Sequence, residues 1–89
     1  MTETTYTVSN DVIESPVGDE IVMLHLGNST YYGLDPVGVR VWTLLKEGEA
    51  PDAIRDALAR EYDVEPEIIA KDIARFLDEL EANGMVSRA

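Results

Sequence analysis

Residues 27–45 read GNSTYYGLDPVGVRVWTLL, and this stretch predicts a turn, a short strand and a helix in direct succession. Thr30–Leu34 is rich in the β-branched and aromatic residues that favour strands, and a Gly-Asn-Ser turn precedes it. Asp35 suits the N-cap of the following helix, and Pro36 suits its first position. Because no later segment looks like a strand, we expect Thr30–Leu34 to lie at the edge of a sheet.

Two extended segments precede this stretch. The first is predicted over Tyr6–Glu14, and a turn is predicted at Ser15–Asp19. The second covers Glu20–Leu26, whose nearly continuous apolar run favours burial on most of both faces, as in a middle strand. With Thr30–Leu34, these segments are expected to form an antiparallel meander. Residues 1–5 are polar and are expected to fray.

Three helices are predicted after the strands. They cover residues 36–47 and 51–62, and then residue 66 to about residue 83. Gly48 and Gly84 stand where glycine commonly ends a helix. The order of three strands and three helices predicts an α+β fold of the winged helix-turn-helix kind, with a three-stranded antiparallel sheet as the wing. We expect residues 1–89 to form one domain.

The charge of the chain is strongly negative and unevenly distributed. The net charge is −11, and all seven Lys and Arg residues stand at or after position 40, whereas six acids stand before it. A nucleic-acid-binding protein needs a basic patch to neutralise phosphates, so this charge argues against one. The simplest interpretation of the acids is solubility, and the functional alternative is a basic peptide partner.

The sequence offers little material for catalysis or for a cofactor. There is no Cys, and the only histidine, His25, is expected to be structural. No assembled nucleophile, base or metal site is visible, so we predict neither an enzyme nor a bound cofactor. Trp42 stands at a core spacing of its helix. No apolar run is long enough to span a membrane, and the N-terminus does not resemble a signal peptide, so a cytoplasmic protein is expected.

Two neighbouring features could form a binding surface. The predicted edge strand Thr30–Leu34 lacks the Lys or Pro residues with which proteins usually protect such edges. The apolar stripe of the third helix is wide and contains Ile68, Ile69, Ile73, Phe76, Leu77 and Leu80. Part of this stripe could line a groove, or all of it could belong to the core. A strand edge beside an apolar helical groove is suited to bind an extended peptide by strand addition.

An ordered set of short motifs runs through most of the chain. It comprises EIVMLHLG at 20–27, YYGLD at 31–35, Val41-Trp42, Leu44-Leu45, Gly48, Ile54, Leu58, Tyr62–Val64, Asp72-Ile73, Phe76-Leu77, Leu80 and Gly84–Val86. Each motif is weak alone, but in this order the set resembles the PqqD-like proteins, the peptide recognition elements of ribosomal peptide natural-product pathways. The resemblance implies a three-stranded sheet with three helices, which agrees with the elements predicted above.

The resemblance also implies a binding mode. Proteins of this family bind the leader part of a precursor peptide as a fourth, antiparallel strand on the third strand, in a cleft against the third helix. Carried onto this sequence, the implied peptide-binding residues are Thr30, Tyr31, Tyr32, Gly33, Leu34, Ile69, Asp72, Ile73, Arg75, Phe76 and Glu79. The chain looks most like the standalone members of lasso-peptide pathways. It departs from the quinone-cofactor branch at residues 27–29, where that branch typically carries Pro-Glu-Arg.

The implied partners are a precursor leader with Tyr and Pro three residues apart, a transglutaminase-like leader protease and an asparagine-synthetase-like cyclase. A Lys-rich leader is our own inference from the negative charge. The alternatives are a peptide chaperone of another modification pathway, a DNA-binding winged helix, a small enzyme, and a dimer formed through two strand edges. The DNA-binding alternative is weak because the third helix offers only Lys71 and Arg75 among many acids.

Overall fold

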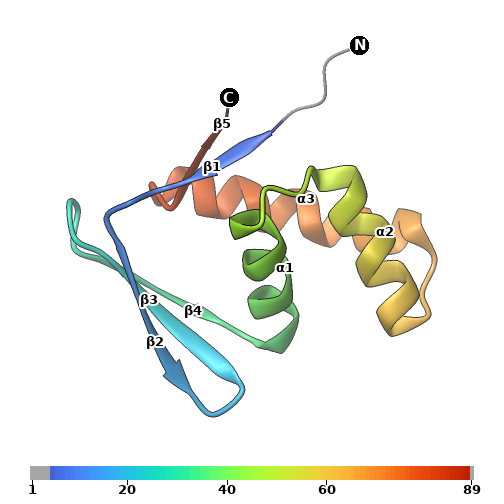
Figure 1. The fold of residues 1–89 in the computed structure, drawn as a ribbon, viewed down its shortest axis with the longest axis horizontal. Helices are drawn as coiled ribbons and strands as arrows, with labels where there is room; N and C mark the ends of the chain where they lie inside the picture. The colour runs from blue at the N-terminus through green and yellow to red at the C-terminus, as the bar shows by residue number, and fades with distance from the viewer. Residues whose placement is uncertain (1–4, 89) are drawn as a thin grey trace.

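A computed structural model describes residues 5–88 of the chain (Figure 1). The elements in order are β1 (Tyr6–Val8), β2 (Val12–Val17), β3 (Glu20–His25), β4 (Thr30–Leu34), α1 (Pro36–Lys46), α2 (Pro51–Tyr62), α3 (Pro66–Ala82) and β5 (Val86–Arg88). The predicted fraying of residues 1–5 falls, apart from Thr5, outside the described residues. Within residues 5–88, no helix is both long enough and apolar enough to cross a membrane.

The predicted antiparallel meander and the three helices that follow it are confirmed. The strand order of the sheet is β2-β3-β4, so β4 pairs with β3 on one side only. The pairing runs from Ile21 opposite Leu34 to His25 opposite Thr30. Among the described residues, no strand occupies the other side of β4, which is therefore an open sheet edge.

The prediction of one strand over Tyr6–Glu14, and of no strand after Leu34, was wrong. The first segment is divided into β1 and β2, and β1 pairs antiparallel with β5 at the other end of the chain. The predicted turn at Ser15–Asp19 is also shorter than expected, because β2 extends to Val17. Pro16 is tolerated there since β2 is an edge strand. A strand of three residues such as β5 has too few positions to show an alternating pattern.

Local capping explains why the helices begin and end where they do. The Asp35 carboxylate accepts the backbone N–H of Gly38 at 2.7 Å and so caps α1. At the end of α3, Gly84 has a φ of 76°, a conformation that glycine adopts without strain. Met85 donates its N–H to the Leu80 carbonyl at 2.9 Å, which completes a Schellman cap. This cap reverses the chain and directs β5 back towards β1.

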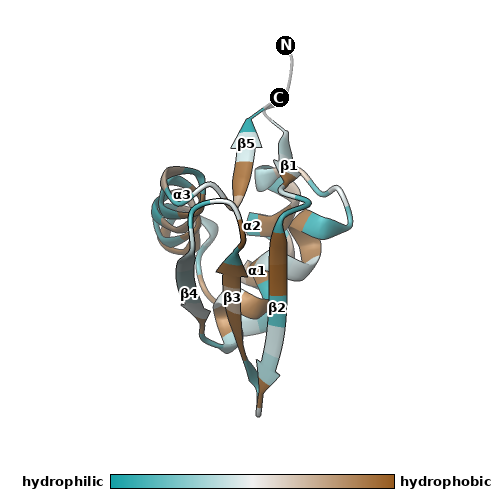
Figure 2. Cartoon of the chain, turned by 90° about the vertical axis from the view of Figure 1, so that its left-hand side faces the viewer, coloured by the Kyte–Doolittle hydropathy of each residue, from teal (hydrophilic) through white to brown (hydrophobic). Residues whose placement is uncertain are grey.

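The core lies between the inner face of the sheet and the three helices. Trp42 is 1% exposed, which confirms its predicted packing role, and Met23 and Leu80 are fully buried. The prediction that Glu20–Leu26 is buried on most of both faces was wrong. Met23 faces the core, but Val22 and Leu26 are exposed because no helix covers the outer face of the sheet (Figure 2).

His25 has a structural role in the turn between β3 and β4. Its Nδ1 atom accepts the backbone N–H of Gly27 at 3.0 Å and that of Asn28 at 3.3 Å. The Asn28 side chain in turn donates to the carbonyl of Asn83 at 3.2 Å, at the end of α3. This turn is therefore attached to the helical part of the molecule, which helps to fix the direction in which β4 leaves it.

Candidate functional site

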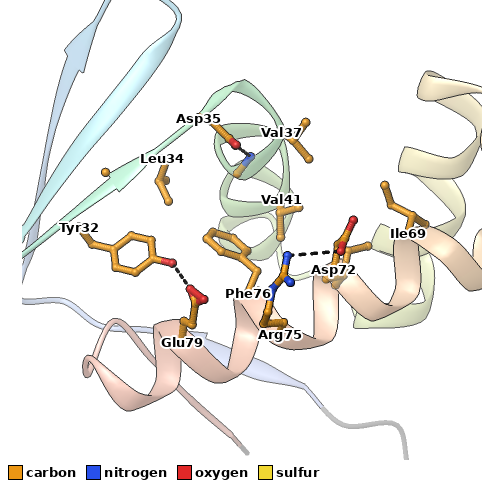
Figure 3. Close-up of a pocket in the computed structure, with 13 residues that line it drawn as sticks. Tyr32, Leu34, Asp35, Val37, Val41, Ile69, Asp72, Arg75, Phe76 and Glu79 are labelled. Atoms are coloured by element: carbon orange, nitrogen blue, oxygen red, sulfur yellow. Dashed lines mark hydrogen bonds and ion pairs between the residues drawn. The ribbon is translucent and has the colours of Figure 1, made fainter.

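A groove of about 420 Å³ opens between β4, the start of α1 and α3 (Figure 3). Strand β4 and the first turns of α1 form one side, and α3 forms the other. The lining residues are Tyr32, Gly33, Leu34, Asp35, Val37, Gly38, Val41, Ile69, Asp72, Ile73, Arg75, Phe76 and Glu79. The groove lies directly beside the open edge of the sheet.

Nine of the eleven residues that the resemblance implies for peptide binding line this groove. Thr30 and Tyr31 do not, because Thr30 begins β4 at its far end and the Tyr31 side chain belongs to the outer face of the sheet. Tyr31 is 71% exposed. Their backbone nevertheless belongs to the same strand, so the groove and the strand edge form one continuous surface.

Four lining residues come from the N-cap and first turns of α1 and were not among the predicted site residues: Asp35, Val37, Gly38 and Val41. A sequence signal for them existed. Because Asp35 caps a helix that starts immediately after β4, the first turn of that helix has to lie beside the end of the strand. The spacing of Val41 indicated only a core position, and its side chain is 2% exposed.

The register determines which backbone groups of β4 are free. Along an antiparallel strand, residues whose N–H and C=O point to one neighbour alternate with residues that point to the other side. Leu26 donates its N–H to the Asp11 carbonyl at 2.8 Å, so the even-numbered residues of β3 direct their backbone N–H and C=O groups to β2. The odd-numbered residues of β3 direct these groups to β4, where their partners are the even-numbered residues. Tyr31 and Gly33 therefore direct their N–H and C=O groups to the open edge.

The floor of the groove is apolar and firmly packed. Leu34 and Ile73 are 2% and 5% exposed and belong to the core. The rings of Phe76 and Tyr32 lie 6.1 Å apart between centroids, at an angle of 52°. Such a floor can accept a large apolar side chain, whose burial contributes about 1.5–3 kcal/mol.

The rim of the groove is polar and acidic. The Tyr32 hydroxyl donates a hydrogen bond of 2.7 Å to Glu79 Oε2, which connects β4 to α3. Arg75 forms an ion pair of 3.4 Å with Asp72, and both side chains are largely exposed. With Asp35, the lining residues include three carboxylates and one guanidinium. The groove therefore favours a ligand that carries positive charge.

Tyr32 is expected to titrate unusually late. Burial and, second, the hydrogen bond to Glu79 raise the pKa of Tyr32 above its ordinary value, to about 12. Because folding raises the pKa of Tyr32, this residue stabilises the folded state fully below about pH 10, and the stabilisation is lost as the pH rises through about 12.

Ultraviolet titration should show this late ionisation of a tyrosine in the wild type and in Tyr31→Phe, but not in Tyr32→Phe. In Glu79→Gln the ionisation should move towards pH 10. A transition near pH 12 that persists in Tyr32→Phe would contradict the assignment of this transition to Tyr32.

Comparisons with known proteins decide the family. The family model described as coenzyme PQQ synthesis protein D (PqqD) matches residues 20–86. The chain belongs to the PqqD family. This match includes β3, β4, all three helices and every residue that lines the groove.

Two solved structures have the same architecture as this PqqD-family chain. One is TbiB1 in complex with the TbiA(beta) leader peptide, which is 40% identical, with a TM-score of 0.84 and coverage of 90% of this chain and 93% of that chain. The other is a lasso peptide synthetase B1 complexed with its leader peptide, with a TM-score of 0.83 and coverage of 92% and 96%. At 23% identity, this second similarity shows the shared fold alone. A search of curated protein sequences gave no match.

Proposed function

We propose that this chain binds the leader region of a ribosomally made precursor peptide, without catalysing a reaction itself. The leader adds to β4 as a fourth, antiparallel strand and packs its side chains into the groove against α3. The observation that carries the proposal is the open edge of β4 directly beside the apolar groove. The 40% identical TbiB1, which was solved with a leader peptide, supports it.

The contacts of the proposed complex are sufficient for stable binding of the leader. Each main-chain hydrogen bond contributes about 0.5–1.5 kcal/mol net. One or two large apolar side chains in the groove add about 1.5–3 kcal/mol each. After the cost of association is subtracted, these contributions reach a binding free energy near −8 kcal/mol, which corresponds to about micromolar affinity or better.

The proposed role is delivery of the precursor within a lasso-peptide pathway. The chain, as a single domain over residues 1–89, holds the leader so that a transglutaminase-like protease can remove it. An asparagine-synthetase-like cyclase is a further proposed partner. The assignment rests on the motif set at residues 20–86, which resembles the standalone members of lasso-peptide pathways. Because the precursor is made on ribosomes, the proposed location is the cytoplasm.

The proposal is tested by fluorescence polarisation with a labelled, Lys-rich leader peptide that contains a Tyr-x-x-Pro motif. The expected result is an affinity of about micromolar or better. A peptide in which the Tyr is replaced by Ala is the control, and it should bind markedly more weakly. If no such leader binds to the folded protein, the lasso assignment is wrong.

A second candidate uses the same groove in a different pathway. The matching family model takes its description from coenzyme PQQ synthesis, which favours a peptide chaperone of another modification pathway as the alternative. The two candidates differ only in the peptide that fits the groove. Binding of a precursor that lacks the Tyr-x-x-Pro motif, in preference to one that contains it, would favour this second candidate.

Charge reversal at Asp72 is expected to weaken the binding of a Lys-rich leader. Asp72 lies at the rim of the groove, and replacing it by Lys removes one attractive charge, adds a repulsive one and leaves Arg75 without its ion-pair partner. We expect Asp72→Lys to reduce the affinity by about fivefold at low salt and to raise the dissociation rate. The effect should shrink in high salt, where exposed charges are screened.

The matched control for this variant is Glu49→Lys, which changes the net charge equally on an exposed loop outside the groove. It should bind the leader nearly as the wild type does. Equal affinity of Asp72→Lys and the wild type at low salt would show that Asp72 does not contact the leader.

A further inference from the structure

One end of the groove is bordered by exposed apolar side chains. Val37 and Ile69 line this end, which lies away from Tyr32 and Glu79 (Figure 3). Large apolar residues are exposed there on the first turn of α1 and around the connection from α2 to α3. We call these residues the end patch: Val37, Tyr62, Val64 and Ile68, which are between 37% and 61% exposed.

Ile68 continues the row of α3 side chains that forms the rim of the groove. Asp72, Arg75 and Glu79 follow it at intervals of three or four residues, which is the spacing of side chains on one face of a helix. Because a helix rises about 1.5 Å per residue, Ile68 lies about 6 Å beyond Asp72 along the axis of α3. About two residues of an extended peptide cover this distance. A peptide that leaves the groove past Ile69 therefore meets Ile68.

An ion pair holds the end of α2 at the same surface. Arg40, one turn after Val37 on α1, donates to both carboxylate oxygens of Glu61 at 2.8 to 3.1 Å. Tyr62 follows Glu61 directly, and Val64 lies in the short connection that leads into α3. The end patch thus joins three helix ends around the mouth of the groove.

Acidic residues stand beside the end patch. Asp63, Glu65 and Glu67 lie in the connection and the first turn of α3, and all three are exposed. Within residues 5–88 none of them forms an ion pair, whereas Glu61 is paired with Arg40. A peptide segment that covers the end patch is therefore expected to carry Lys or Arg beside its apolar side chain.

We propose that the end patch binds the part of the leader that precedes the segment in the groove. This part carries a large apolar side chain with a neighbouring Lys or Arg. The inference rests on the proposed function, in which the leader runs antiparallel to β4. Because β4 runs from Thr30 towards α1, an antiparallel leader enters the groove at the α1 end, and its N-terminal side passes over the end patch.

Continuity of the peptide chain selects this occupant. The residues that precede the groove segment have to cross the surface at the mouth of the groove, so a separate protein there would compete with the entering leader. The end patch has four side chains, whereas a stable protein–protein interface has about 20–30 residues on each side. At the other end of the groove, the Asn28 and Asn83 side chains are polar and already hydrogen-bonded.

The test compares two labelled synthetic peptides in the polarisation assay with the full chain. One is the complete Lys-rich leader, and the other lacks every residue before the Tyr-x-x-Pro motif. For the wild type, we expect the complete leader to bind at least about fivefold more tightly, because it buries a further apolar side chain. In Ile68→Ser this difference should disappear, and both peptides should bind as the short one binds the wild type.

The matched control for Ile68→Ser is Val17→Ser. Val17 is 60% exposed on β2, and Ile68 is 61% exposed on α3, but only Ile68 belongs to the end patch. Val17→Ser should keep the full difference between the two peptides. Because both side chains are exposed, circular dichroism of the two variants should match that of the wild type.

A second variant tests the acidic surroundings without altering the apolar side chains. Glu65→Lys should weaken the complete leader at low salt and leave the short peptide unchanged. Glu49→Lys, which changes the net charge equally on a loop outside the groove and the end patch, should affect neither peptide.

Two results would overturn the inference and leave the proposed function standing. These are equal affinities of the two peptides for the wild type, and a difference between them that persists undiminished in Ile68→Ser. A wild-type dimer that Ile68→Ser dissociates in analytical ultracentrifugation would also overturn it, since a second copy would then occupy the end patch. If neither peptide binds to the folded protein, the proposed function fails and the inference falls with it.

Discussion

Gly33→Pro is expected to weaken leader binding by about 30-fold or more while the protein remains folded. The register directs the Gly33 N–H to the open edge of β4, where an added strand would accept it. Proline removes this donor and places its ring where the leader backbone has to approach. The lost hydrogen bond and the leader carbonyl left without a partner together cost about 2–4 kcal/mol. A factor of ten in affinity corresponds to about 1.4 kcal/mol.

The fold should tolerate this proline because β4 is an edge strand and Gly33 does not have a positive φ. Gly33→Ala is the matched control: it retains the N–H, and a Cβ atom at this position meets nothing within 4 Å. Polarisation titrations of both variants, with circular dichroism to verify folding, provide the measurement. If folded Gly33→Pro binds the leader as tightly as Gly33→Ala does, the leader does not pair with this edge in the register described.

Trp42→Ala is expected to remove a large part of the stability of the domain. Trp42 is 1% exposed and packs in the core between the sheet and the helices. Truncation of a buried aromatic residue to alanine typically costs about 3–5 kcal/mol. At roughly 0.05–0.15 kcal/mol per residue, a domain of this length has about 4–13 kcal/mol in total. Urea unfolding followed by circular dichroism should therefore show a large decrease in the midpoint, or no folded baseline.

Trp42→Phe is the control, and a smaller loss is expected for it. The indole N–H of Trp42 is buried and has no partner at hydrogen-bond geometry among the described residues. Burial tends to raise the pKa of Glu14, but the nearby indole and Lys46 outweigh it and lower that pKa. We interpret the indole contact as an electrostatic attraction that falls short of a hydrogen bond. Phe removes the unpaired donor and keeps most of the packing, so equal losses in the two variants would contradict this explanation.

The helices and the meander could be predicted because their signals are local. Asp35 and Pro36 start α1, and Gly48 and Gly84 follow helix ends, each for a reason contained in a few neighbouring residues. Strand β5 could not be predicted in this way. Its three residues are held by pairing with β1 at the opposite end of the chain, and sequence patterns do not encode which distant segments meet.

The candidate site was likewise predictable only where its signals are local. The apolar stripe of α3 was visible, but its division between core and groove depends on where β4 and α1 lie. Ile73 belongs to the core and also forms part of the floor of the groove, while Ile68, from the same stripe, faces outward. For the same reason the apolar run of β3 predicted two covered faces, since hydrophobicity alone does not reveal that the helices cover only one.

The pairing of β1 with β5 has a consequence for synthesis of the chain. Val8 lies opposite Val86, which is made 78 residues later, and Ser9 donates its N–H to the Met85 carbonyl at 2.9 Å. The strand pairings within the meander, and the contacts of the meander with α1, involve only residues that are made earlier than β5. The nascent chain can thus assemble the open edge of β4 while β1 still lacks its neighbour, and the β1-β5 pairing forms only after residues 86–88 have been made.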